Sequence, residues 1–142
     1  MILFLDFDGV LHPCYGSPDG AFCYLERLED VLRDFPAVRV VLTTSWREKT
    51  PIDYLVGNFS PDVRGRIIGG TPVIIQNEPP YRPYVRHEEI KAYLKDRPAE
   101  RYVILDDKAE WFPESETNLI VCNDGFFDEE EAQLRAVLEA WR

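Results

Sequence analysis

Aspartates stand directly after two short apolar segments of the sequence. Asp6 and Asp8 follow the first segment, and Asp106 and Asp107 follow a later one. Carboxylates held close together repel one another, and a hard divalent cation removes this repulsion. Mg²⁺ binds carboxylate and water oxygens. The four aspartates therefore predict a magnesium site, formed where the two segments end.

The pair Asp6 and Asp8 also suits the cleavage of a phosphate ester in two steps. Asp6, at the end of the apolar segment, would attack phosphorus and form an aspartyl phosphate. Asp8 would protonate the departing oxygen and later accept a proton from water. The turn formed by Asp8 and Gly9 allows the second carboxylate to swing toward the leaving group. This pattern predicts a phosphatase.

Hydroxyl groups follow a third apolar segment, residues 38–42. We predict that Thr44 forms a hydrogen bond with a phosphoryl oxygen. Ser45 is the alternative, because strand ends are defined only to within a residue or two. Arg47 follows closely, and it could either bind a substrate phosphate or be a surface residue at the start of a helix.

A cation beside the phosphoryl group would complete the site. We prefer Arg86, because it lies at the N-terminus of a predicted helix, beside the carboxyl ends of the strands, and on nearly the same face as Ile90. Lys91 is the next choice, although it lies roughly 7 Å further along the helix axis and off that face. The other candidates are Arg82 and Lys108.

Apolar segments alternate with helical patterns along the chain. Strands are predicted at residues 2–5, 38–42, 102–105 and 118–122. Helices are predicted at 25–35, at 52–59, in a segment through Ile90 that ends before Pro98, and at the C-terminus, where Asp128 is the expected N-cap. This alternation predicts an α/β fold with a mostly parallel sheet and helices on both faces. Such folds bind ligands at the carboxyl ends of their strands, where the aspartates and hydroxyls stand.

Length, charge and cysteine content narrow the class of protein. The 142 residues predict a single domain over 1–142. The formal net charge of −10 disfavours an extended nucleic-acid-binding surface but permits a local basic pocket. No apolar segment approaches the ~20 residues of a membrane span, and the opening residues lack the pattern of a signal peptide. Three cysteines without a CxxC pair indicate reduced thiols, so we expect a cytoplasmic protein that does not bind membranes.

These motifs resemble those of the haloacid dehalogenase (HAD) superfamily of phosphotransferases. The matching segments are Leu3–Gly9, which contains DxDG, Val40–Thr44, and Val103–Asp107. Together with Thr44–Arg47 and Arg86–Ile90, they are similar to small HAD domains that have no cap. Some of those domains are associated with RNA repair, and polynucleotide 3′-phosphatase domains are a related comparison.

The resemblance implies a three-layer α/β/α Rossmann-like fold, no large cap domain, and Mg²⁺-dependent phosphatase activity. It makes Asp6 the nucleophile and Asp8 the acid and base, with the Asp8 backbone carbonyl as a metal ligand. Asp107 would bind the metal directly and Asp106 through water. The usual cation of the family is lysine, so Arg86 departs from the common pattern, although a guanidinium can clamp a phosphate with two N–H groups.

Two segments control how a substrate would reach the site. Residues 12–24 are rich in Pro and Gly and predict a mobile flap, whereas residues 50–85 form a loop-rich insertion that is too short for a cap domain. An open site admits large substrates and phosphorylated ends of macromolecules. Arginines could form a local basic rim, and aromatic rings could stack on a base. The alternative, which we prefer, is that the rings pack loops onto the core and the arginines are solvated. The residues concerned are Arg64, Arg66, Arg82, Arg86, Trp46, Tyr81 and Tyr84. His12 and His87 are expected to be ordinary polar residues near the site rather than proton carriers or metal ligands.

Three functions compete for this sequence. The leading one is a Mg²⁺-dependent phosphatase for an unidentified substrate, such as a phosphorylated nucleotide or polynucleotide end; an oligomer is compatible with it. The alternative is a catalytically silent binding or scaffold protein with a HAD fold, which the intact aspartates disfavour. A phosphorylation-switch receiver domain is a third, but there the acidic pair follows the first strand and the phosphoacceptor the third, the reverse of the order here.

Overall fold

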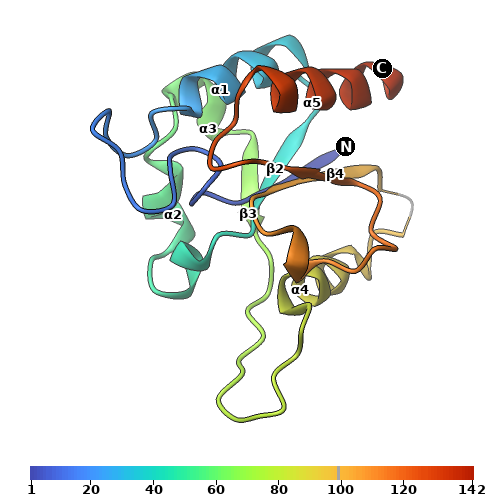
Figure 1. The fold of residues 1–142 in the computed structure, drawn as a ribbon. Helices are drawn as coiled ribbons and strands as arrows, with labels where there is room; N and C mark the ends of the chain where they lie inside the picture. Colours follow the sequence, from blue (N-terminus) through green and yellow to red (C-terminus); the bar gives the residue numbers. More distant parts are fainter. Residues whose placement is uncertain (99) are drawn as a thin grey trace.

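A computed structural model describes residues 1–98 and 100–142. Its five strands form one sheet in the order β3-β2-β1-β4-β5, and every neighbouring pair is parallel (Figure 1). The strands are β1 (Ile2–Leu5), β2 (Arg39–Leu42), β3 (Ile67–Gly70), β4 (Tyr102–Asp106) and β5 (Leu119–Val121). The predicted α/β Rossmann-like fold, with a parallel sheet and no large cap, is confirmed.

Helices cover both faces of this sheet. Helices α1 (Leu25–Asp34) and α5 (Asp128–Ala140) lie side by side on one face, and α4 (Val85–Leu94) lies on the other (Figure 1). The shorter elements are α2 (Ile52–Val56), α3 (Pro61–Arg64) and the 3-10 helices η1 (Ser45–Glu48) and η2 (Ala109–Trp111). Within the described residues, no helix is long and apolar enough to cross a membrane.

The central strand shows how the two apolar cores form. Successive side chains of a strand point to opposite faces of the sheet. Leu3 and Leu5 of β1 accordingly belong to the larger core beneath α1 and α5, whereas Ile2 and Phe4 belong to the smaller core beneath α4. All four are buried, because helices cover both faces, and this explains why the segment is apolar at every position.

Three local predictions differ from the structure. Strand β3 was not predicted, because two of its four residues are glycines, which weaken a strand signal; β3 pairs with β2 through an irregular register. The helix expected over 52–59 ends at Val56 and is followed by α3. Asp128 is the first residue of α5 rather than its N-cap, and it pairs with Arg27, while the Glu130 carboxylate accepts the N–H of Phe127.

The connections open a crevice between two neighbouring strands. After β1 the chain leads to α1 on one face of the sheet, whereas after β4 it leads to η2, which contacts α4 on the opposite face. Strands whose connections leave in opposite directions part at their carboxyl ends, and ligands bind in the gap between them. The end of β1 carries Asp6, and the end of β4 carries Asp106. The topology therefore brings together the two acidic motifs of the sequence.

Candidate active site

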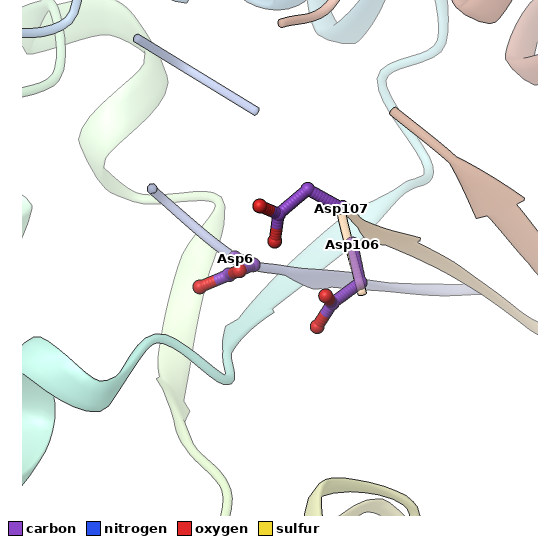
Figure 2. Close-up of side chains that lie close together, drawn as sticks. All are labelled: Asp6, Asp106 and Asp107. Carbon is purple, nitrogen blue, oxygen red and sulfur yellow. The ribbon is translucent and has the colours of Figure 1, made fainter. Parts of the chain in front are cut away.

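Three carboxylates meet where β1 and β4 end. Leu5 of β1 pairs with Leu105 of β4, so the residues that follow stand at the same level of the sheet. Asp6, Asp106 and Asp107 each contribute one oxygen to a group whose members lie within 4.8 Å of one another (Figure 2). Asp6 and Asp106 are buried, and Asp107 is partly exposed.

Burial and mutual repulsion disfavour three negative charges in this space. Burial raises the pKa of Asp6 well above its usual range, and the neighbouring Asp106 and Asp107 raise it further, against the opposing charge of Arg86. Burial is also the main cause that raises the pKa of Asp106 to about 7. The pKa of Asp107 is raised too, again chiefly by burial. A cation bound among these oxygens would reverse this preference for the protonated forms.

The carboxylate of Asp106 shows that the group fits a cation. Its Oδ1 accepts the backbone N–H of Lys108 at 2.9 Å. Its Oδ2 is buried and has no hydrogen-bond partner among the residues that the structure describes. A buried, unpartnered carboxylate oxygen is costly unless a ligand completes it. A donor set made only of oxygen atoms matches the preference of Mg²⁺.

Gly9 makes the turn that brings the DxDG segment against the carboxylates. Its φ is 75°, and its N–H donates to the carbonyl of His12 at 2.8 Å. A Cβ atom at this position would lie only 2.2 Å from Oδ2 of Asp107. Any side chain here would combine backbone strain with a collision at the cluster, so both conditions require glycine.

Asp8 lies apart from the three clustered carboxylates. Its Oδ1 is 2.8 Å from Nε2 of His12, and its Oδ2 accepts the indole N–H of Trp46 at 3.0 Å. Its side chain is 36% exposed, so water or a substrate can reach it. The prediction that Asp8 helps to hold the metal therefore concerns its backbone carbonyl and not its carboxylate.

The two hydroxyls expected to bind a phosphoryl group, those of Thr44 and Ser45, have different surroundings. Thr44 is the N-cap of η1 and accepts the N–H of Trp46 at 3.3 Å, while Ser45 is exposed. Thr43 and Thr71 are buried, and within the described chain their hydroxyls have no partner. Sequence reasoning missed both residues. The available signal was that Thr43 comes directly after β2, and that Thr71 follows the paired glycines of the unpredicted β3.

The candidate cations lie in different places. Arg86, in the first turn of α4, is buried, and its charge lowers the pKa of both Asp6 and Asp106. Its Nε has no partner among the described residues. Lys108 places its Nζ 3.9 Å from Oδ2 of Asp107. The structure therefore puts Arg86 and Lys108 beside the carboxylates.

Lys91 and Arg82 are engaged elsewhere. Nζ of Lys91 donates to the hydroxyl of Tyr102 at 2.9 Å, near the amino end of β4, and lies 3.8 Å from Glu116. Arg82, on the loop that precedes α4, pairs with Glu88 of that helix. Neither residue contacts the carboxylate cluster within the described chain.

The guanidinium of Arg47 is bonded to other groups of the protein. Its guanidinium donates to four backbone carbonyls and forms an ion pair of 2.9 Å with Glu89. The four carbonyls belong to Thr43, Thr44, Thr71 and Pro72. The side chain is only 3% exposed. Arg47 thus ties the loops after β2 and β3 to α4, which corrects both alternatives of the sequence analysis.

Two arginines that were considered for a basic rim, against the alternative that we preferred, lie away from the carboxylate cluster. Arg66 precedes β3 and donates to the carbonyls of Leu32, Phe35 and Val38 at the amino end of the sheet. Arg64 donates to carbonyls in the loop after α2. The rim therefore contains neither residue. His87, expected near the site, instead faces Glu116 at 3.1 Å.

The aromatic residues considered for base stacking also differ in their surroundings. Trp46 packs against Phe7, Phe22 and His12, whereas Tyr81 is 60% exposed on the long loop before α4. A cleft of about 570 Å³ runs from Arg86 between this loop and the end of η2, and Ser45, Ile75 and Trp111 are among its lining residues. Arg86 is thus the candidate cation that this cleft exposes to a ligand.

Comparison with known families agrees with this geometry. A family model described as "HAD domain in Swiss Army Knife RNA repair proteins" matches residues 2–130. The chain belongs to this HAD family. No curated protein and no solved structure gives a significant match.

Membership of this HAD family covers every element that forms the site. The match begins in β1 and extends into α5, so it includes the DxDG segment, the hydroxyls after β2, Arg86 and the acidic pair. The family indicates a HAD-type hydrolase. The expected resemblance to HAD domains of RNA-repair proteins is confirmed.

Proposed function

We propose that this HAD domain is a Mg²⁺-dependent phosphatase that works through an aspartyl phosphate on Asp6. The observation that carries the proposal is the cluster of Asp6, Asp106 and Asp107 beside the buried Arg86. Asp6, Asp106, Asp107 and the Asp8 backbone carbonyl would hold Mg²⁺. Bound there, the ion would neutralise the clustered carboxylates and attract the phosphoryl oxygens.

The reaction follows from the positions of the two aspartates in the DxDG segment. A carboxylate oxygen of Asp6 forms a bond to phosphorus while the bond from phosphorus to the leaving oxygen breaks. The leaving oxygen keeps the electron pair and takes a proton from Asp8. Water then attacks the same phosphorus, Asp8 accepts its proton, and the Asp6–phosphorus bond breaks. The products are the alcohol and inorganic phosphate.

Arg86 and the buried hydroxyls would hold the phosphoryl group during both steps. Arg86 has an unpartnered Nε, and Thr43 carries an unpartnered hydroxyl directly after β2. Hydrogen-bond donors that stand ready in a water-poor site stabilise the negative charge of a transferring phosphoryl group. We therefore add Thr43 to Thr44 and Ser45 as a candidate partner of a phosphoryl oxygen.

The substrate that we propose is a phosphorylated nucleotide or polynucleotide end. Membership of a family of RNA-repair domains supports this class. The part of the substrate that follows the phosphate would enter the pocket that Asp8, His12 and Trp46 line, where Asp8 can protonate the leaving oxygen. The net charge of −10 favours recognition of an end over binding along a nucleic-acid strand.

Replacing Asp6 by Asn tests the mechanism. We expect hydrolysis of an aryl phosphate in the presence of Mg²⁺ to fall by at least about 10³-fold, as losses of catalytic nucleophiles do. A chelator should abolish the wild-type activity, and added Mg²⁺ should restore it. Glu116→Gln is a matched control, because Glu116 is a buried carboxylate at the opposite end of β4. Activity that survives in Asp6→Asn would contradict the mechanism. A wild type that binds phosphorylated oligonucleotides but never hydrolyses them would favour the scaffold alternative.

A further inference from the structure

Both oxygens of the Asp8 carboxylate meet N–H donors of buried or partly buried rings. Trp46 donates its indole N–H to Oδ2, and Nε2 of His12 faces Oδ1. The Asp8 side chain is partly exposed, whereas His12 is only 5% exposed. A partly exposed carboxylate is thus held by two less exposed rings.

The imidazole of His12 is fixed in position and in tautomer. Its Nδ1 accepts the backbone N–H of Phe22 at 3.1 Å, so the ring proton resides on Nε2 and is donated to Asp8. The ring also packs between Phe22 and Trp46, with centroid distances of 5.1 and 5.5 Å. Both ring nitrogens of His12 are therefore engaged by groups of the protein.

A pocket lies next to the carboxylate of Asp8 and the two rings that hold it. This pocket of about 320 Å³ is lined by Asp8, His12 and Trp46 together with the segment 13–21. The larger cleft at Arg86 does not include Asp8 among its lining residues. A leaving group in this pocket would lie beside the Asp8 carboxylate.

We infer that His12 and Trp46 are positioning residues, which hold the Asp8 carboxylate at this pocket for the proton transfers of the proposed reaction. This inference rests on the proposed phosphatase function. When Asp8 gives its proton to the leaving oxygen, a negative charge develops on its carboxylate. Because both carboxylate oxygens are held by fixed N–H donors, the carboxylate stays at the pocket where the leaving oxygen must receive the proton. In the second step they hold the same carboxylate ready to accept a proton from water.

The test compares two phosphate esters that need this proton to different extents. The oxygen of an alkyl phosphate departs poorly without a proton, whereas the oxygen of p-nitrophenyl phosphate departs readily. For His12→Phe and Trp46→Phe, which keep a ring but remove the N–H, we expect kcat/KM for the alkyl ester to fall about 10- to 100-fold. For the nitrophenyl ester the fall should be less than about threefold. The quantity kcat/KM is chosen because it reports the step in which the leaving group departs.

Three further variants separate positioning from packing. His12→Gln retains an N–H donor and should recover part of the loss. Phe22→Leu loosens the same aromatic cluster without removing a donor to Asp8, and should affect both esters equally. In an Asp8→Asn background, His12→Phe should cause no additional loss of kcat/KM, because a residue that acts only through Asp8 has nothing left to position.

The outcomes separate this inference from the function on which it rests. Equal losses on both esters, or a full additional loss in the Asp8→Asn background, would overturn the positioning role while the phosphatase assignment stands. If His12→Phe does not fold, Trp46→Phe and the conservative His12→Gln still give the comparison. A wild type without Mg²⁺-dependent turnover would overturn the phosphatase function, and the inference would fall with it.

Discussion

The two ends of the parallel sheet use the same kinds of residue in opposite ways. At the amino end, the guanidinium of Arg66 is bonded to three backbone carbonyls. Glu116 there meets both His87 and the hydroxyl of Tyr102. At the carboxyl end, four buried side-chain atoms have no partner among the described residues, and they belong to Thr43, Thr71, Arg86 and Asp106. Buried polar groups that are satisfied within the chain stabilise the fold, whereas those left unsatisfied indicate a ligand.

Helix α4 carries one cation near each end of the sheet. Arg86 is in its first turn and acts on the clustered carboxylates, whereas Lys91 lies more than a turn further on and bonds to Tyr102. A helix rises about 1.5 Å per residue, so the five residues from Arg86 to Lys91 carry α4 from the carboxyl end of the sheet toward its amino end. Variants at paired positions can measure how sharp this division is.

The largest contrast is expected between two glycines. Gly9→Ala places a Cβ 2.2 Å from a carboxylate oxygen of Asp107 and strains a turn at φ 75°. We expect Mg²⁺-dependent activity to fall at least about 100-fold, because displacement of catalytic groups by about 1 Å has losses of this size. Gly65→Ala, near the amino end of β3, meets no atom within 4 Å among the described residues and should leave activity unchanged. Wild-type activity in Gly9→Ala would show that Asp107 need not be held in place.

The two cations of α4 provide the next contrast. Arg86→Gln removes the positive charge beside Asp6 and should lower kcat/KM for an aryl phosphate about 100-fold, since loss of one donor to a developing charge costs about 10²–10³-fold. Lys91→Gln should change kcat/KM by less than about twofold. Steady-state kinetics at saturating Mg²⁺ measures both. The reverse ranking would make Lys91 the cation of the site.

Arg66 should matter for stability alone. Replacing it with Met leaves three carbonyls without their charged donor, and we expect the free energy of unfolding to fall by about 2 kcal/mol. The kcat should stay unchanged, because Arg66 precedes β3 at the end of the sheet opposite the carboxylates. Urea unfolding, followed by circular dichroism, and an activity assay on the same sample measure the two effects. A fall in kcat without a fall in stability would place Arg66 in the site.

The smallest expected effect is the dependence of folding stability on pH and on bound Mg²⁺. The folded-state pKa values of Asp6, Asp106 and Asp107 are raised, so between about pH 4 and pH 7 these three groups bind more protons in the folded protein than in the unfolded chain. Without metal, their contribution to stability is therefore fully present at low pH and is lost as the pH rises through this range. We expect a loss of roughly 1 kcal/mol or more, since one pKa unit corresponds to about 1.4 kcal/mol. Mg²⁺ should accordingly raise Tm more at pH 8 than at pH 5.

Asp106→Asn provides the control for that dependence. It removes one charge but retains an oxygen to accept the N–H of Lys108, so the metal-free variant should lose less stability with rising pH than the wild type. It should also gain less from Mg²⁺. Glu116→Gln, at the amino end of the sheet, should instead lower Tm equally with and without Mg²⁺. Thermal unfolding in chelator and in Mg²⁺ distinguishes the two variants.

The sequence determined the parts of this protein that depend on short-range pattern. The strand at 2–5 was predictable because a strand with both faces covered is apolar at every position. The placement of Asp6 and Asp106 followed from the rule that parallel strands meet at their carboxyl ends, and the preference for Arg86 over Lys91 followed from helix geometry. In each case the rule is applied to the pattern of a short segment of the sequence.

Tertiary structure alone decided which polar groups would be satisfied. Arg47 and Arg86 have the same side chain and both stand near strand ends. Carbonyls of its own loop and of the distant loop after β3 enclose Arg47, whereas Nε of Arg86 is left without a partner in the described chain. The same applies to Asp8, whose two donors come from residues 4 and 38 positions away in the sequence. A hydrogen bond depends on where separate segments meet in space, and local residue pattern does not contain that information.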